Sequence, residues 1–318
     1  MAFIRKRNGI WQVQVRSRDC GSIAKSFHKK ADAEYWAKNQ EALMQSGQWQ
    51  KTSLCDLTIG HMIEEYARRV TPQKRGKESL KIAHKIRNDD IKSCKQIGKN
   101  GLEIIQNIYK KKKRCINILT HCNAGWLATV DWGTALAPIF FAKRKKIPIH
   151  IWVDETRPRN QGALLTSWEL KNENIPHTVI VDNAGGHLMQ NKEVDMCLVG
   201  SDRTTISGNV CNKIGTYLKA VVAYENKIPF FVALPTSTID KKIKKISDIP
   251  IEIRDGNELS KVNLKIKNKL LSASIYEKET PTLNPAFDVT PKKFITFHVF
   301  HFMLKYFRRQ SIKHRTFC

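Results

Sequence analysis

Two residues with reactive side chains each follow a short apolar run of the sequence. Cys122 comes after the run 115–119, and Asp202 comes after the run 194–199. A thiol can handle or shield a proton transfer, although an unpaired cysteine is more often an inert core residue. A buried carboxyl has a raised pKa and could act as a general acid, but Asp202 could equally pair with its neighbour Arg203. From the residues alone both interpretations of each side chain stay open.

Polar residues that could contact a substrate follow other apolar runs. Gln161 is predicted to begin a helix after a strand, where backbone N–H groups favour anions. Asn212 and Lys213 are also predicted to begin a helix, so the alternative for Lys213 is a cation on a helix surface. Hydroxyl and phosphate groups are the chemistry that these three side chains would bind.

No metal site is predicted. His121 adjoins Cys122, but neighbours on an extended segment point to opposite faces, so we expect a structural role for His121. Cys122, Cys211 and His187 have the right side-chain types for a metal, but they lack a ligand spacing.

These residues belong to a segment in which apolar runs alternate with helical patterns. This alternation predicts an α/β fold, a Rossmann-like parallel sheet with helices on both faces. Chemistry in such sheets gathers at the carboxyl ends of the strands. The expected strands are 115–119, 147–153, 177–181, 194–199 and 229–233, and the expected helices are 91–108, 131–145, 160–173, 184–191 and 212–226.

Six motifs of this segment together resemble the methylthioribose-1-phosphate isomerase family, over about residues 89–293. Its wider superfamily includes ribose-1,5-bisphosphate isomerases and the regulatory subunits of the exchange factor for translation initiation factor 2. The pairing of Cys122 with Asp202 favours the isomerases. The motifs are ILTHCNAG (118–125), VDETRPRNQGALLTSWEL (153–170), VGSDR (199–203), NKIGTY (212–217), PTSTID (235–240) and LNPAFDVTP (283–291).

The resemblance implies conversion of 5-methylthioribose 1-phosphate to 5-methylthioribulose 1-phosphate in methionine salvage. It assigns Asp202 as proton donor, Cys122 to hydrogen transfer or transition-state stabilisation, and Gln161, Asn212 and Lys213 to substrate binding. It further implies a cytoplasmic enzyme that needs no cofactor, is not associated with membranes and forms a homodimer.

The amino-terminal residues have a different texture, and they predict a small α+β module. Asn8-Gly9 between two alternating runs is a hairpin signal, a third strand is expected at 22–27, and helices are expected at 30–46 and 59–70. Polar residues alternate with apolar ones on this sheet, which could read DNA through arginine and glutamine side chains or simply be a solvated face. The residues in question are Arg5, Arg7, Gln12, Gln14 and Arg16.

Residues 1–85 resemble the amino-terminal part of a phage-type tyrosine recombinase, without its catalytic domain. We therefore expect four parts: an integrase-like DNA-binding module (1–50), a helical core-binding-like fragment (51–88), the isomerase-like domain (89–293) and a divergent basic, aromatic tail (294–318). The isomerase family's phosphate-gripping Arg-Gly-Ala loop is absent, so we expect severely reduced activity. The alternatives are an inactive fusion remnant with weak DNA binding, or a regulatory sugar-phosphate binder.

Composition narrows the classes of protein further. The chain of 318 residues has 55 Lys and Arg against 29 Asp and Glu, a net charge of +26. Its pI near 9.8 fits a polyanion-binding protein, and a lysine-rich composition explains it equally well. The eight cysteines form no CxxC pair, and no apolar run is long enough to cross a membrane. These features exclude a secreted disulfide scaffold, a membrane channel and a zinc ribbon.

Overall fold

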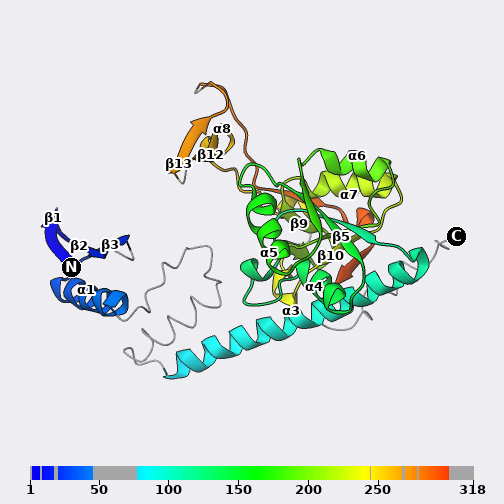
Figure 1. Ribbon diagram of the computed structural model, residues 1–318. Coiled ribbons are helices and arrows are strands. Elements are labelled where there is room, and N and C mark those ends of the chain that lie inside the picture. The colour runs from blue at the N-terminus through cyan, green and yellow to red at the C-terminus, as the bar shows by residue number, and fades with distance from the viewer. Residues whose placement is uncertain are drawn as a thin grey trace. The chain divides into compact units, whose positions relative to one another are not determined.

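The computed structural model describes residues 2–7, 9–17, 21–45, 77–243, 245–266, 269–277 and 279–300. The chain divides into two compact units, Met1–Leu57 and Thr58–Cys318 (Figure 1). The helix expected at 59–70 and the end of the expected tail lie outside the described residues. Within the described residues, no helix is both long enough and apolar enough to span a membrane.

The first unit is an antiparallel sheet packed on one helix, as the alternating pattern predicts. Gly9, with a φ of 79°, turns the chain between the first two strands. Val13 and Val15 are buried against Ala33 and Ala37 of the helix. The elements are β1 (Ala2–Arg7), β2 (Ile10–Ser17), β3 (Gly21–Phe27) and α1 (Lys30–Gln45).

The second unit begins with α3 (Lys77–Lys112), a helix of 36 residues. It contains the predicted helix 91–108 and extends well beyond it at the amino end. The sequence has neither glycine nor proline between 77 and 97, so nothing local interrupts the helix there. The helix consequently runs through the boundary expected at 88–89.

A six-stranded parallel sheet forms the centre of the second unit. Its strands lie in the order β15-β10-β7-β4-β5-β6, and every adjacent pair is parallel. The five predicted strands are confirmed, with ends shifted by one or two residues in most cases. The bounds are β4 (Ile116–Thr120), β5 (Ile149–Asp154), β6 (His177–Ile180), β7 (Met196–Val199), β10 (Phe230–Ala233) and β15 (Phe297–Val299).

The sixth strand, β15, corrects the expectation of a divergent tail from residue 294. Its polar His298 hid the strand in the sequence. In the structure His298 is buried, and its Nε2 lies 3.0 Å from the Gly208 carbonyl oxygen, which satisfies the ring inside the core. Burial lowers the pKa of His298 to about 4. Residues 297–299 are therefore part of the central sheet.

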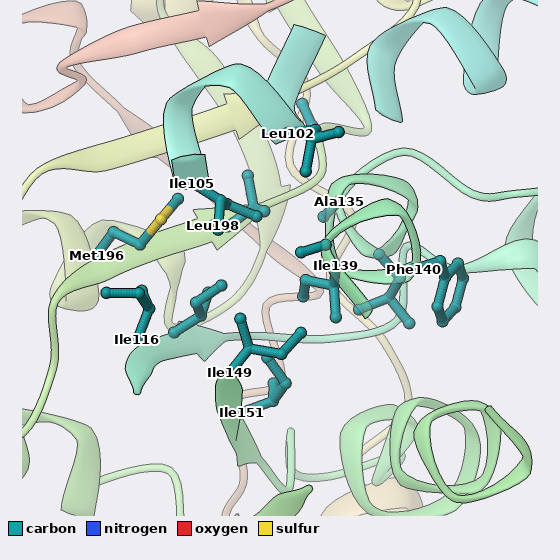
Figure 2. Close-up of a cluster of buried hydrophobic side chains, with 14 of the residues drawn as sticks. Leu102, Ile105, Ile116, Ala135, Ile139, Phe140, Ile149, Ile151, Met196 and Leu198 are labelled. Carbon is teal, nitrogen blue, oxygen red and sulfur yellow. The ribbon is translucent and has the colours of Figure 1, made fainter. Parts of the chain in front are cut away.

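Helices cover both faces of this sheet, as predicted. α3, α4 and α5 pack on one face, where side chains such as Ile105, Ile139 and Leu198 form one buried cluster (Figure 2). α6 and α7 pack on the other, against Cys197 and Val199. The alternation of Leu198 with Cys197 and Val199 follows from the pleat of β7. The bounds are α4 (Leu136–Arg144), α5 (Ser167–Asn172), α6 (Ala184–Gln190) and α7 (Thr216–Glu225).

A smaller sheet of order β11-β8-β9-β14 follows the central one, and it corrects the helix predicted at 212–226. Asn212 and Lys213 end β9, because β9 pairs with the distant β14, and Gly215, with a φ of 101°, separates the strand from α7. The bounds are β8 (Arg203–Thr205), β9 (Val210–Lys213), β11 (Ile239–Asp240) and β14 (Phe287–Thr290). The remaining elements are α8 (Asn257–Ser260) and the hairpin β12 (Lys261–Ile266) and β13 (Lys269–Ser274).

The packing of α3 on the sheet generates a stability prediction. Ile105 is fully buried, so Ile105→Ala should lower the free energy of unfolding by about 2–5 kcal/mol. Ile86 lies on the same helix and is 64% exposed, so Ile86→Ala should change it by less than about 0.5 kcal/mol. Urea unfolding of both variants is the measurement, and equal effects would show that α3 does not pack as described.

Candidate functional site

Cys122 and Asp202 lie at the point where the central sheet reverses its winding direction. From β4 the chain builds outward through β5 and β6, and it then returns to add β7 on the other side of β4. In open parallel sheets, ligands bind outside the carboxyl ends of the two strands at such a switch point. Cys122 follows β4 and Asp202 follows β7. The sheet therefore places both predicted residues beside its expected ligand site.

The backbone at Cys122 is held in an uncommon conformation. Its φ is 66°, in the left-handed region that residues other than glycine seldom adopt. Its N–H donates to Oγ1 of Thr156 at 2.9 Å, and its carbonyl accepts from Oγ1 of Thr166 at 2.7 Å. Burial raises the pKa of the half-buried Cys122 thiol to about 11, so the thiol is neutral near pH 7.

The loop after Cys122 is fixed by Glu169, a residue that the sequence analysis did not single out. Its buried carboxyl accepts hydrogen bonds from Asn123 Nδ2 at 2.9 Å and from the backbone N–H groups of Trp126 and Leu127 at 2.8 and 3.2 Å. A Cβ at Gly125 would lie 1.9 Å from Oε2 of Glu169, so only glycine fits there. The sequence offered no signal beyond a carboxylate within an apolar helical stretch.

Asp202 is exposed, which corrects the expectation of a buried carboxyl. Its backbone N–H donates to the Cys211 carbonyl at 3.1 Å. The surrounding protein still displaces part of its water and raises the pKa of Asp202, while Lys213 and Arg254 oppose this shift. Arg203 pairs with Asp240, with Nη1 and Oδ2 3.2 Å apart, so the alternative in which Arg203 is the partner of Asp202 is not observed.

Lys213 and Gln161 line a common recess, together with Pro158, Arg159, Arg254 and Asn284. Lys213 is only 6% exposed, and its Nζ lies 4.4 Å from the centre of the Phe287 ring. It is therefore a buried strand residue rather than the helix-surface cation considered from the sequence. The structure thus adds Arg159, Arg254 and Asn284, which come from segments that no sequence pattern linked to the motifs.

Charge coupling ties this recess to the two reactive residues. Lys213, Asp202 and Arg254 all shift the pKa of Cys122, after the larger effect of burial and a hydrogen bond from Asn123. Asn212 stands apart from the recess lining: it is buried, and its Nδ2 donates to Oγ1 of Thr216 at 3.0 Å. The structure therefore brings together Cys122, Asp202, Gln161 and Lys213, and places Asn212 beside them in β9.

A buried polar cluster supports the ends of the strands at this site. His121 lies 2.8 Å from Asp154 through Nδ1 and 2.8 Å from the Ile214 carbonyl through Nε2. Nζ of Lys219 lies 3.2 Å from Asp154 and donates to the Asp182 carbonyl at 2.6 Å. These bonds join the ends of β4 and β5 to the start of α7, consistent with the structural role expected for His121.

His121, Asp154 and Asp182 are also the described residues whose ligand atoms could surround a metal, because these atoms lie within 4.8 Å of one another. The ammonium group of Lys219 already lies against Asp154, so the cluster contains its own cation. The set weighed from the sequence differs, because His187 is exposed on α6 and lies 3.0 Å from Asn191 Nδ2.

In the first unit, strand register places the predicted DNA-contacting residues together. Arg5 is opposite Gln12, and its Nε donates to Gln12 Oε1 at 3.2 Å. Arg7 and Gln14 share this face by alternation, whereas Val13 and Val15 face α1. The position of Arg16 in β2 has the same parity, and its backbone pairs with Ser22.

The buried carboxyl of Glu169 generates a pH prediction. Burial raises its pKa from 4.5 to about 7, with the hydrogen bonds from Asn123, Leu127 and Trp126 opposing the shift. The folded chain therefore keeps a proton that the unfolded chain releases, and this stabilisation is complete below 4.5 and lost as pH rises through about 7. Relative to Glu169→Gln, the wild-type chain should lose about 2–4 kcal/mol of unfolding free energy across that window.

Urea unfolding at a series of pH values checks this prediction, with Glu103→Gln on the exposed surface of α3 as the control variant. A constant difference between the wild-type chain and Glu169→Gln across the window would contradict the assigned burial.

Known proteins share this architecture and these motifs. Methylthioribose-1-phosphate isomerases from Methylorubrum extorquens, Brucella anthropi and Escherichia coli are 55%, 52% and 56% identical to this chain, over 213, 238 and 218 residues. These matches cover 66%, 74% and 68% of this chain. The chain spans 58%, 65% and 58% of the lengths of these relatives.

Two solved structures are similar to the chain, each with a TM-score of 0.61. One is 5-methylthioribose 1-phosphate isomerase from Pyrococcus horikoshii, at 28% identity, with 94% of this chain and 90% of that one covered. The other is the delta subunit of translation initiation factor eIF-2B from A. fulgidus, at 32% identity, covering 87% and 76%. The model of the Initiation factor 2 subunit family matches residues 30–301, a range that begins within α1. The chain belongs to the Initiation factor 2 subunit family.

Proposed function

We propose that the chain is an aldose–ketose isomerase that converts 5-methylthioribose 1-phosphate to 5-methylthioribulose 1-phosphate. The observation that carries the proposal is the placement of Cys122 and Asp202 at the ends of adjacent strands, with the cations Lys213 and Arg254 acting on both. The names of the relatives support the same reaction.

The reaction moves hydrogen within one molecule, so it needs no external oxidant or reductant. In the proposed mechanism, Asp202 donates a proton to the ring oxygen as the bond between that oxygen and C1 breaks. The hydrogen on C2 then moves to C1, and the proton of the C2 hydroxyl returns to Asp202 as the C2 ketone forms. The raised pKa of Asp202 favours the protonated form that the first step requires.

Cys122 serves this mechanism as a neutral thiol. With its pKa raised to about 11, it is a poor proton acceptor near pH 7. We therefore assign Cys122 to shielding the hydrogen transfer from water rather than to removing a proton from carbon. Gln161, Asn212 and Lys213 are proposed to bind the hydroxyl and phosphate groups of the substrate.

Formation of the ketose phosphate by the purified chain is the direct test. Asp202→Asn removes the proton donor without changing the size of the side chain, and it should lower turnover by roughly 10²- to 10⁴-fold. Cys122→Ser keeps a small polar group but loses the thiol, so it should also lower turnover. Asp131→Asn, on an exposed loop away from the recess, is the matched control for the charge change and should retain activity.

The outcomes separate this proposal from its alternatives. Turnover that survives Asp202→Asn would reject the assigned proton donor. Substrate binding without turnover in the wild-type chain would favour a regulatory sugar-phosphate binder, and absence of both would favour an inactive remnant. The reduced activity expected from the sequence stays a prediction that the same assay measures.

A second function, DNA binding by the first unit, is favoured by the arrangement of its sheet. Arg5, Arg7, Gln12 and Gln14 lie on the face turned away from α1, and Arg5 and Arg7 are exposed. Arginine can contact phosphates and glutamine can contact base edges from such a face. The recombinase resemblance of residues 1–85 stays part of this proposal.

Binding of the full chain to a random duplex tests the DNA proposal. Affinity should fall steeply as salt rises, because phosphate contacts release counterions. The double variant Arg5→Gln and Arg7→Gln should weaken binding and flatten the salt dependence by about two charges. The control pairs Lys29→Gln with Lys38→Gln, two exposed lysines at and near α1. Equal weakening by both pairs would mean that general positive charge, not this face, binds DNA.

A further inference from the structure

Two buried polar atoms without partners occur in the recess beside Asp202. Gln161 Oε1 and Arg254 Nε are both inaccessible to solvent, and neither has a hydrogen-bond partner within the described residues. Buried polar atoms are hydrogen-bonded in the great majority of cases. One is an acceptor and the other a donor, so a ligand with both hydroxyl and anionic groups would satisfy the pair.

Arg254 is anchored in a way that leaves this donor available. Its backbone N–H donates to the Asn284 carbonyl at 2.8 Å, and its Nη2 donates to Glu252 Oε2 at 3.0 Å. The guanidinium centre lies 5.7 Å from the Phe287 ring, the same ring that Lys213 approaches to 4.4 Å. One side of the guanidinium group is thus held by Glu252, and Nε is the donor left over.

The charges around the recess leave a positive surplus on Lys213. Arg159 is paired with Glu258, whose second oxygen accepts from Asn284 Nδ2 at 3.2 Å. In the described part of the chain, no carboxylate lies within ion-pair distance of Lys213 Nζ. An anion between Lys213 and Arg254 would neutralise this surplus and accept the unused hydrogen bond.

The position of these two cations relative to the reactive residues fits one ligand chemistry. In a glycosyl phosphate, the phosphate group is bonded to C1, which is also a reacting carbon. Its binding site must therefore adjoin the groups that act on C1 and C2. Lys213 and Arg254 both act electrostatically on Cys122 and on Asp202, so they meet this requirement.

We propose that Arg254 is a phosphate-binding residue of this site, donating from Nε to the C1 phosphate group while Lys213 supplies the opposing charge. This inference rests on the proposed isomerase function for the identity of the sugar, but the phosphate contact can be tested without it. Gln161 then accepts a hydrogen bond from a sugar hydroxyl through Oε1. An arginine from the Ile249–Arg254 segment thus supplies a phosphate contact inside the family domain itself.

The test compares inorganic phosphate binding and turnover in Arg254→Gln and Arg254→Lys. Phosphate binding is measured by calorimetry, and kcat and KM are measured with 5-methylthioribose 1-phosphate. Losing one charge-assisted hydrogen bond should weaken phosphate binding and lower kcat/KM roughly 10- to 150-fold in Arg254→Gln. Arg254→Lys should be intermediate, because lysine keeps the charge but cannot reproduce the guanidinium geometry.

Arg144→Gln is the matched control, since Arg144 lies on α4 with its guanidinium centre 4.2 Å from the Trp132 ring, away from the recess. It should change both readouts by less than about twofold. Circular dichroism establishes that each variant is folded. If Arg254→Gln does not fold, Arg254→Lys carries the test.

The two readouts distinguish failure of this inference from failure of the proposed function. A wild-type chain that binds phosphate through Arg254 but does not turn over the sugar supports the inference and rejects the isomerase. A chain that turns over the sugar with kcat/KM and phosphate binding unchanged in both Arg254 variants overturns the inference alone. Absence of phosphate binding by the wild-type chain at millimolar concentrations also overturns it.

Discussion

The pairing of β4 with β7 is the constraint on which the candidate site depends. Asp195 clamps this pair near its amino end, where its buried carboxylate accepts from the Asn117 N–H at 2.8 Å and pairs with Lys112 and Arg114. At the other end, Thr120 Oγ1 donates to the Leu198 carbonyl at 2.8 Å. The winding of the sheet reverses between these two strands, so no crossover helix covers the edge where Cys122 and Asp202 emerge.

Polar groups beneath this edge do the work of positioning. Glu169 orders the loop after Cys122, and the cluster of His121, Asp154 and Lys219 joins the ends of β4 and β5 to the start of α7. Burying such groups is costly unless they are paired, and here nearly all are. The paired cluster fixes the backbone, while the groups left without partners face the recess. Support and ligand binding are thus assigned to different layers of the site.

The sequence was sufficient where structure is local. Continuous apolar runs predicted the five strands, and their ends predicted where Cys122 and Asp202 lie, because parallel strands share one carboxyl edge. It was insufficient where pairing is distant: β9 gains its partner from β14, so Lys213 was assigned to a helix. The contribution of Arg254 was missed for the same reason, since its segment meets Asn284 only in the fold. The sixth strand was hidden by His298, whose polarity is satisfied only after folding.

The central claim is that the edge beside β4 and β7 is a preformed site for a glycosyl phosphate. Thermal unfolding of the purified chain with and without 5-methylthioribose 1-phosphate tests it most directly, because a ligand that binds only the folded state raises the melting temperature. The account predicts a rise that grows with ligand concentration and is lost in Lys213→Met. An unchanged melting temperature at saturating ligand, or an equal rise in Lys213→Met, would contradict it.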